Sequence, residues 1–518
     1  MNPPAAAVGD ARRALPADAG VAAALGALQT LAYVHTSLWP LQLACIAALV
    51  HLAARRRPTG AALLGLAFGS AWLAAGTWWL YVSLHDYGGL PAVLAVLSVA
   101  VLSLGLALYL AAALGLWARG RCGVWWRDAL LFGACWLLAE LCRGVVFTGF
   151  PWIASGYAHV DGPLAGFAPW IGVYGMGAIA AMIAAAAALL ERRSLRGPAL
   201  AVVLTLALGV LAGQARFSEP TGTLRVTLLQ GNVPQNEKFA AEHLPDTLEW
   251  TRGQLLDAKG DLVVGPETVI PLLPDQLDPD WWNPIVEHFR RGTQAALVGI
   301  PLGDAEAGYT NSAVGLSADS ARLPGGLYRY DKHHLVPFGE FVPNGFHWFV
   351  RMMNIPLGDF NRGPLAAPSF EVRGERVAPN ICYEDLFGEE LATRFVDEAR
   401  APTLFANLSN IAWFGRTVAI DQHLQISRLR ALEFERPMVR ATNTGATAVI
   451  DHRGVVTAAL APHTQGTLDG IVQGRRGVTP YARWAGAWGL WPAWLAGALL
   501  AIATFRRPHA GGRATPLP

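Results

Sequence analysis

The sequence predicts a membrane protein in two parts, a bundle of about eight membrane-spanning α-helices and a layered α/β domain. Of its 518 residues, 53% are hydrophobic and only 15% are charged, so the composition departs from that of an average soluble protein in both directions. The apolar residues are also unevenly placed. Residues 20–215 and 482–505 are almost entirely apolar, whereas residues 220–475 read like an ordinary soluble domain. The formal net charge of +2 gives no indication of a nucleic-acid partner.

The apolar regions divide into segments of roughly membrane-spanning length. A helix needs about 20 apolar residues to cross the hydrocarbon core of a bilayer. The predicted spans are residues 20–35, 37–54, 60–82, 90–117, 126–146, 164–190, 198–214 and 482–505. The first two are short and lie close together, so they are predicted either as two spans or as one broken or re-entrant hairpin. The N-terminus resembles a signal peptide, with Arg12 and Arg13 before an apolar run, but further spans follow directly and an uncleaved anchor is expected.

The basic residues between the spans predict the orientation. Arginines occur in every second loop, at Arg55–Arg57, Arg119–Arg127, Arg192–Arg196 and Arg506–Arg507. By the positive-inside rule these loops are cytoplasmic. The predicted organisation is a cytoplasmic segment 1–19, transmembrane helices over 20–214, an outer domain over 220–475, a last helix over 482–505 and a cytoplasmic tail 506–518. The outer domain then faces the periplasm or an equivalent space.

Two features of the membrane part are candidates for function. Glu140 and Arg143 lie three residues apart on one helical face, where they can pair; a structural pair and a functional one are equally compatible with this spacing. The aromatic turn Thr148–Trp152 is predicted either as part of an interfacial aromatic belt or as a lip through which a lipid reaches the outer domain.

The outer domain alternates short β-type runs with helical patterns, which predicts a layered α/β domain. Predicted strands are 224–230, 261–265, 295–301, 311–316, 377–382, 402–408, 439–443 and 446–451. Predicted helices are 244–258, 284–291, 389–399 and 419–435.

One cysteine of the chain lies in this polar domain. Cys382 is at the end of a predicted strand, and alternation along a strand would place Glu384 on the same face. Its other four cysteines lie in the apolar N-terminal segments. A buried, inert cysteine is the simpler interpretation of Cys382 taken alone.

Three further residues favour a catalytic interpretation. Glu267 ends the strand Asp261–Gly265 in a Pro-Glu context, and Lys332 and Glu340 lie on one loop. Acyl transfer through a thioester needs a thiol, a base to take its proton and a cation beside the oxyanion. The backbone N–H of Tyr383, directly after the cysteine, is a second candidate oxyanion donor.

With their neighbours, these residues resemble the nitrilase superfamily. The contexts are Pro-Glu-Thr at Glu267, Tyr-Asp-Lys-His-His-Leu-Val-Pro-Phe-Gly-Glu around Lys332, and Ile-Cys-Tyr-Glu around Cys382. Together with the predicted spans, they resemble one membrane-embedded family of that superfamily, apolipoprotein N-acyltransferase. Further matching segments are 149–152, 230–235, 407–415, 423–445 and 479–483.

The resemblance implies an α-β-β-α sandwich for residues 220–475 and a two-step, ping-pong acyl transfer in a bacterial inner membrane. Cys382 would take an acyl chain from a phospholipid, typically phosphatidylethanolamine, and pass it to the N-terminal amine of a diacylated apolipoprotein. Glu267 would act as base and acid, and Lys332 would hold the oxyanion. Glu340 and Glu384 would orient Lys332 and the thiol or amine, and Tyr383 would donate its N–H. No cofactor or metal is expected, and the protein is expected to act as a monomer.

The sequence departs from the family pattern at three positions. Gly265 stands where a tryptophan is common, Ile411 where an aspartate is frequent, and Phe239 is the nearest match to an aromatic lid residue. Phe239, Phe150, Trp152 and Trp413 are the candidate residues of a substrate lip. These departures concern substrate preference more than the reaction.

Two other functions remain as alternatives. A membrane-anchored amidase or nitrilase would use the same Glu-Lys-Cys triad with water as acceptor, although eight spans favour a lipid substrate. A transporter with a binding domain would need charges along a membrane path, and the predicted spans contain very few.

Overall fold

The computed structural model describes residues 5–189, 196–350 and 359–506. These residues form two compact units. The helical unit contains residues up to 78, 93–215 and those from 490 onwards, and the sheet unit contains 79–92 and 216–489. The predicted arginine loop at 192–193 and the tail after Arg506 lie outside the described residues.

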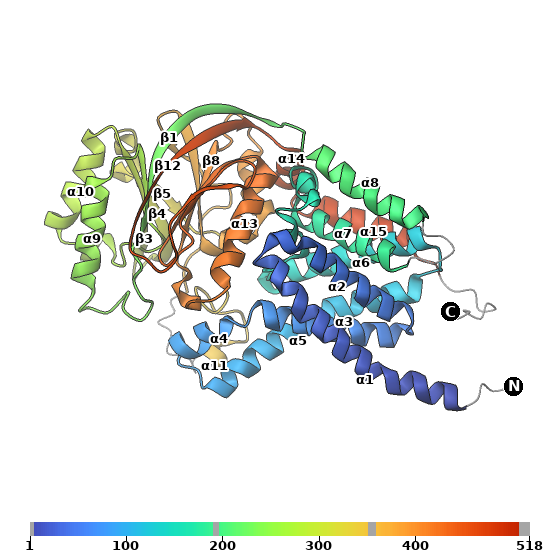
Figure 1. Ribbon diagram of the computed structural model, residues 1–518. Helices are drawn as coiled ribbons and strands as arrows, with labels where there is room; N and C mark the ends of the chain where they lie inside the picture. The colour runs from blue at the N-terminus through green and yellow to red at the C-terminus, as the bar shows by residue number, and fades with distance from the viewer. Residues whose placement is uncertain (1–4, 190–195, 351–358, 507–518) are drawn as a thin grey trace. The chain divides into compact units, whose positions relative to one another are not determined.

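The helical unit is built from long apolar helices (Figure 1). Its helices are α1 Ala5–Leu28, α2 Trp39–Ala54, α3 Pro58–Gly76, α5 Ala92–Gly120, α6 Trp125–Val145, α7 Ala168–Ala188, α8 Arg196–Ala212 and α15 Trp491–Thr504. Among the described residues, six helices are long and apolar enough to cross a membrane, and a seventh span results if α14, Pro480–Trp488, and α15 count as one. The predicted multi-span helical domain is therefore confirmed. The predicted span 198–214 corresponds to α8, whose 17 residues fall short of the usual length.

Two predicted spans end differently in the structure. The predicted span 60–82 stops as a helix at Gly76, and residues 79–82 belong to the sheet unit. There the buried Trp79 side chain donates to Gln422 Oε1 at 3.0 Å, and its ring packs 4.3 Å from that of Phe414. Trp79, which lies shortly after the end of a helix, therefore packs in the core of the sheet unit and does not face lipid.

The predicted last span, 482–505, is two helices. Helix α14 covers Pro480–Trp488 and α15 begins at Trp491. Gly489 between them has φ +56°, a conformation that ends an α-helix and that glycine adopts without strain. Helix α14 buries Tyr481, Ala482 and Ala485 in the core of the sheet unit, which explains why its apolar residues looked like the start of a span.

Buried polar residues hold the aromatic turn of the helical unit. Arg143 pairs with Glu140 at 3.3 Å, as predicted, and donates to the carbonyls of Phe150 and Trp152, each at 2.8 Å. Phe147 in the same turn is 92% exposed. The Glu140–Arg143 pair therefore has a structural use, which is to fix the backbone of the turn.

The sheet unit contains two six-stranded sheets (Figure 1). The first has the order β12-β1-β2-β3-β4-β5, and the second has the order β11-β10-β9-β8-β7-β6. The strands of the first sheet are β1 Ser218–Gln230, β2 Leu262–Val264, β3 Ala295–Asp304, β4 Gly308–Leu316, β5 Tyr328–Asp331 and β12 Gly466–Gly477. Those of the second are β6 Phe370–Val372, β7 Glu375–Ile381, β8 Leu404–Ser409, β9 Met438–Thr442, β10 Ala448–Ile450 and β11 Val456–Ala459.

Three apolar cores arrange these sheets and helices in four layers. The central core joins the two sheets, with Leu228 and Leu297 from one and Ile381 and Leu408 from the other. A second core packs α9 Leu244–Asp257 and α10 Pro279–Arg291 on the first sheet. A third packs α12 Gly388–Ala392, α13 Ala419–Phe434 and α14 on the second sheet. This is the expected α-β-β-α sandwich.

The sequence misses four strands and overextends one helix. The strands β5, β6, β11 and β12 were not predicted; β12 carries four glycines and three charged residues in its 12 residues, and it forms only because it pairs along the whole of β1. The predicted helix 389–399 is α12 followed by a 3₁₀ turn, Thr393–Phe395.

Parallel strands bring distant loops to the same edge. In the first sheet β2 lies parallel to both β1 and β3. In the second, β7, β8 and β9 are parallel, with Ile381 beside Leu408 and Ser409 beside Thr442. The segments that follow β2, β7 and β8 carry Glu267, Cys382 and Asn410, and the segment that follows β5 carries Lys332.

Candidate functional site

Glu267 lies in a tight turn directly after β2. Pro266 precedes it, and Thr268 after it has φ +51°, an uncommon conformation for a residue with a branched Cβ. The turn packs on β3 at Gly299, where an added Cβ would lie 2.4 Å from the Pro266 carbonyl oxygen and 2.8 Å from Glu267 Cα. Strand β3 therefore needs a glycine at this position so that the turn can approach.

The Glu267 carboxylate is buried and fully hydrogen-bonded. Its Oε1 accepts from Asn311 Nδ2 at 2.7 Å and from Lys332 Nζ at 3.3 Å, and its Oε2 accepts from the N–H of Asn410 at 2.8 Å. Burial alone would raise its pKa, but Lys332, Asn311, Lys238 and Asn410 outweigh burial and hold the pKa below its ordinary value. Glu267 is thus ionised at neutral pH, as a proton acceptor must be.

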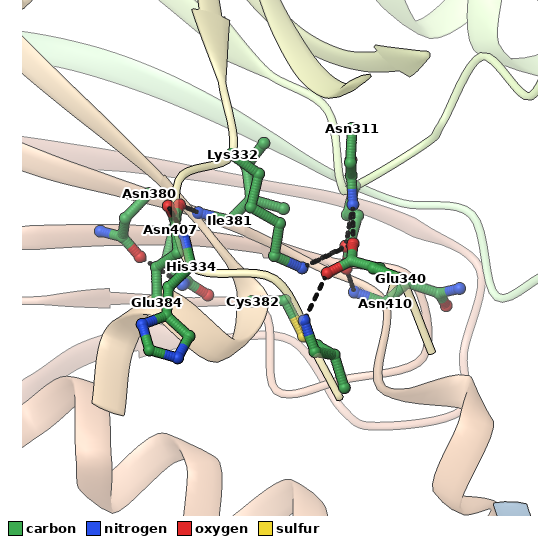
Figure 2. Close-up of polar contacts among 12 residues, drawn as sticks. Asn311, Lys332, His334, Glu340, Asn380, Ile381, Cys382, Glu384, Asn407 and Asn410 are labelled. Carbon is green, nitrogen blue, oxygen red and sulfur yellow. Dashed lines mark hydrogen bonds and ion pairs between the residues drawn. The ribbon is translucent and has the colours of Figure 1, made fainter. Parts of the chain in front are cut away.

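Lys332 follows β5 and is only 1% exposed. Its Nζ lies 2.9 Å from Glu340 Oε1 and 3.3 Å from Glu267 Oε1. Burial favours its neutral form, but the charges of Glu267 and Glu340 outweigh burial and raise its pKa. Asn311 Nδ2 also donates to Glu340 Oε1, at 2.6 Å, so the two carboxylates and the ammonium form one cluster. Figure 2 shows Asn311, Lys332 and Glu340 of this cluster.

Cys382 follows β7 with φ +53° and is half-buried. Burial raises the pKa of its thiol to about 12, and the Glu267 charge adds to the rise, while Lys332 and the hydroxyl of Ser409 oppose it. Figure 2 shows its side chain together with Lys332 and Glu340. The thiol is therefore protonated at neutral pH and needs a base beside it to become a nucleophile.

The turn after β7 differs from the predicted strand end. Cys382 begins a 3₁₀ helix, Cys382–Leu386, so Cys382 and Glu384 are not alternate residues on one strand face. The Glu384 carboxylate instead accepts four hydrogen bonds from two segments, from the N–H groups of Ile381, His333 and His334 and the hydroxyl of Tyr330. It ties the cysteine turn to the backbone that follows Lys332.

Buried polar groups also hold the carbonyl of Cys382. His423 Nε2 lies 3.2 Å from Cys382 O, and because a carbonyl only accepts, Nε2 carries the proton. Nδ1 lies 3.3 Å from Arg440 Nη2 and accepts from it. Burial, with the Arg440 charge, lowers the pKa of His423 well below its ordinary value, which keeps the imidazole neutral. Tyr383, whose N–H directly follows Cys382, has its ring buried against His334 and Phe387.

The sequence reasoning missed four polar residues around the site. Asn311 and Asn410 donate to Glu267, Ser409 lowers the pKa of Cys382, and Lys238 donates to the Glu267 carbonyl at 2.9 Å. The sequence signal for such residues was an asparagine or a serine at the end of a predicted buried strand, because a buried polar side chain needs hydrogen-bond partners.

The candidate lip residues occur in both units. Phe239 is 52% exposed and follows the buried Lys238. Trp413 packs edge-on against Tyr87, with ring centroids 6.0 Å apart. In the helical unit, the side chain of Trp152 is 3% exposed, and its place in a lip stays a prediction. A role for Phe150 stays a prediction.

The departures from the family pattern have local explanations. A Cβ at Gly265 would lie 2.9 Å from Val269 Cγ1, so a tryptophan there would require Val269 to move. Ile411 is completely buried. Among the described residues, no group of three or more histidine, cysteine, aspartate or glutamate side chains could hold a metal ion.

Family models of known proteins match both parts of the chain. Residues 25–186 match the family model described as apolipoprotein N-acyltransferase N-terminal domain, and residues 225–481 match that of carbon-nitrogen hydrolase. The chain is 53% identical over 486 residues to an apolipoprotein N-acyltransferase of Verminephrobacter eiseniae, covering 88% of this chain and 89% of that protein. It is 48% identical over 504 residues to the Ralstonia nicotianae protein of the same description, covering 96% and 94%.

Solved structures similar to the chain include a carbon-nitrogen hydrolase from Helicobacter pylori, with 16% identity, a TM-score of 0.35 and coverage of 53% of this chain and 94% of that one. An amidase from Nesterenkonia matches with 16% identity, a TM-score of 0.34 and coverage of 52% and 94%.

Proposed function

The chain belongs to the apolipoprotein N-acyltransferase family, and on this premise we propose that it transfers a fatty acyl chain from a phospholipid to the N-terminal amine of lipoproteins through a thioester on Cys382. The observation that carries the proposal is the buried cluster of Glu267, Lys332 and Glu340 whose charges act on the Cys382 thiol. It combines an ionised base, a fixed cation and a protonated nucleophile.

In the first half-reaction Glu267 takes the thiol proton while Cys382 Sγ attacks the ester carbonyl carbon. The oxyanion that forms is stabilised by the Lys332 ammonium and the N–H of Tyr383. The ester C–O bond then breaks, and the leaving alkoxide takes the proton from Glu267. The products are a lysophospholipid and an acylated Cys382.

In the second half-reaction a neutral α-amine attacks the thioester carbonyl. Glu267 accepts a proton from the attacking nitrogen, the same donors stabilise the oxyanion, and the C–S bond breaks as Cys382 is reprotonated. Free α-amines have pKa values of about 7.7–8.0, so a substantial fraction of the acceptor is neutral near pH 7.5. The two half-reactions together make a ping-pong reaction, in which one site serves both acyl transfers.

We propose phosphatidylethanolamine as the donor and S-diacylglyceryl-cysteine as the acceptor. Both are lipids, which fits a catalytic domain carried in one chain with several helices of membrane-spanning length. The proposed location is a bacterial inner membrane, with residues 1–19 and 506–518 in the cytoplasm, helices over 20–214 and 482–505, and the catalytic domain over 220–475 in the periplasm. We propose a monomer.

Intact mass spectrometry of the purified protein with phospholipid and no acceptor tests the proposal. We expect a mass increase of one acyl chain that hydroxylamine removes, and none in Cys382→Ser. Cys122→Ser, which changes an exposed cysteine of the helical unit, serves as the matched control and should acylate like the wild type. Addition of a diacylated lipopeptide should then discharge the thioester and yield an amide.

Two outcomes would count against the acyltransferase. Discharge by water at the same rate with and without lipopeptide would identify the alternative, a membrane-anchored hydrolase with the same triad. If no phospholipid acylates Cys382 and none yields a lysophospholipid, the proposal is wrong.

A further inference from the structure

Lysine is rare in this chain, and its positions are unusual. Only three of the 40 basic residues are lysines, at Lys238, Lys259 and Lys332. Lys259 is exposed, but Lys332 and Lys238 are 1% and 5% exposed. In a chain that otherwise uses arginine for positive charge, two of the three lysines are buried beside the same glutamate. The ammonium of a lysine is a compact point charge, whereas the guanidinium of an arginine is planar and larger.

Lys238 reaches the catalytic turn from a loop that follows β1. Its Nζ donates to the main-chain carbonyl of Glu267 at 2.9 Å. The same loop is held at two other points, because Asn410 Nδ2 donates to Gln235 Oε1 at 2.8 Å and the N–H of Val233 donates to Asn443 Oδ1 at 3.0 Å. Lys238 is therefore part of a segment that other hydrogen bonds hold in place. Its contact with Glu267 is thus a defined part of the site.

The charges of the site balance only when Lys238 is included. Glu267 and Glu340 are both 8% exposed, and Lys332 pairs with both of them. With a neutral thiol, the two carboxylates and one ammonium leave a buried net charge of about −1, which is costly in a low-dielectric site. The Lys238 ammonium removes that excess.

We propose that Lys238 is a positioning residue for this reaction, which fixes the Glu267 turn through its main-chain carbonyl and supplies the second positive charge that keeps the Glu267 carboxylate ionised. The inference rests on the proposed function in one respect, the role of Glu267 as the base for Cys382.

The electrostatics of the neighbouring groups agree with this geometry. The charged or titratable groups that act on Lys238 are Glu267 and Cys382, and Lys238 is among those that lower the pKa of Glu267. Burial lowers the pKa of Lys238 itself to about 8, against the opposing effect of Glu267 and Cys382. The lysine is thus mostly charged at neutral pH.

The test is the pH dependence of Cys382 alkylation by iodoacetamide in the full-length protein, followed by mass spectrometry of the peptide that contains Cys382. Lys238→Met removes the charge and the hydrogen bond, Lys238→Gln keeps a neutral donor, and Lys238→Arg keeps the charge. Lys259→Met is the matched control, because Lys259 is exposed. Melting temperatures identify any variant that does not fold.

We expect the alkylation midpoint to move up by about one pH unit in Lys238→Met and Lys238→Gln, because a lost neighbouring cation disfavours the anionic forms of base and thiol. The rate at pH 7 should then fall roughly tenfold. Lys238→Arg and Lys259→Met should keep the wild-type midpoint. If Lys238→Met does not fold, the alkylation midpoints of Lys238→Gln and Lys238→Arg test the proposal in its place.

Equal midpoints in all variants would overturn the proposal, even if Lys238→Met and Lys238→Gln were uniformly slower, because that pattern describes a merely structural residue. A shift in Lys238→Arg as large as that in Lys238→Gln would also overturn it. Alkylation uses neither lipid nor acceptor. A protein that shows the expected shifts but forms no lysophospholipid would refute the proposed function alone, and unshifted midpoints with normal thioester formation would refute the role of Lys238 alone.

Discussion

At the scale of single residues, Asn311 connects the two carboxylates of the site. Its Nδ2 donates to Glu267 Oε1 at 2.7 Å and to Glu340 Oε1 at 2.6 Å. Two carboxylates that share one lysine would repel each other, and a shared amide donor reduces that repulsion. The amide also favours the ionised form of Glu267, since it donates to the carboxylate.

Asn311→Ala should therefore shift the acid limb of the pH–rate profile. As the proposed base, Glu267 would act when deprotonated, so we expect activity to be lost as pH falls through its pKa, which lies below the ordinary value in the native protein. Without the amide that pKa rises, and we expect the acid limb of the rate of thioester formation to move up by about one pH unit. The measurement is the initial rate of lysophospholipid release between pH 4 and 8.

Asn361→Ala provides the comparison, because Asn361 is exposed and its amide donates to the carbonyl of Ala307. Asn361→Ala should leave the acid limb of the pH–rate profile at the same pH as in the wild type. An Asn311→Ala profile that superimposes on that of Asn361→Ala would show that the shared amide does not govern Glu267.

At the scale of elements, strand β3 supports the turn that contains Glu267 through a glycine. The turn at Pro266 and Glu267 lies directly over Gly299, and the atoms that a Cβ would meet are backbone atoms, which cannot move aside as the end of a side chain can. The sequence around Gly299 predicts a strand, but only the packing of β2 against β3 explains the glycine within it.

We expect Gly299→Ala to displace the Glu267 turn. Overpacking of this kind destabilises proteins by about 1–3 kcal/mol, and a shifted base should lower the rate of thioester formation at least tenfold. Thermal unfolding and lysophospholipid release measure the two effects separately.

The matched control is Gly253→Ala in α9, where an added Cβ meets nothing within 4 Å. It should raise stability by about 0.5–1 kcal/mol, the difference in helix propensity, and leave the rate unchanged. If Gly299→Ala behaves like Gly253→Ala, the contact between β3 and the turn is not required.

At the scale of the whole molecule, the arginine loops predict which side of the membrane each part faces. Cys122 is exposed in the loop that begins at Arg121, and Arg119 lies in the last turn of α5 before it, so Cys122 should lie in the cytoplasm. Asp319 is on the sheet unit with its side chain 75% exposed, so a cysteine introduced there should face the periplasm.

A membrane-impermeant maleimide applied to spheroplasts should therefore label Asp319→Cys before lysis and Cys122 only after lysis. Peptide mass spectrometry distinguishes the two sites within one protein. Labelling of Cys122 in intact spheroplasts, with Asp319→Cys protected, would mean that the orientation is reversed.

The sequence by itself determined the division into membrane helices and a polar domain, because apolar runs of spanning length are a local property of the chain. It also predicted an α/β domain and singled out Glu267, Lys332, Glu340 and Cys382, since their short motifs are local too. It could not predict β12, which depends on pairing with β1, or the break at Gly489 between α14 and α15.

Only the tertiary structure decided how the candidate residues meet. The sequence placed Glu384 beside the thiol, whereas in the fold its carboxylate joins Ile381 to His333. It gave no role to Asn311, Asn410 or Lys238, whose importance comes from contacts with Glu267 made across 44, 143 and 29 residues. Such contacts depend on which strands lie side by side and on which groups lose water on burial. A local sequence pattern determines neither of these.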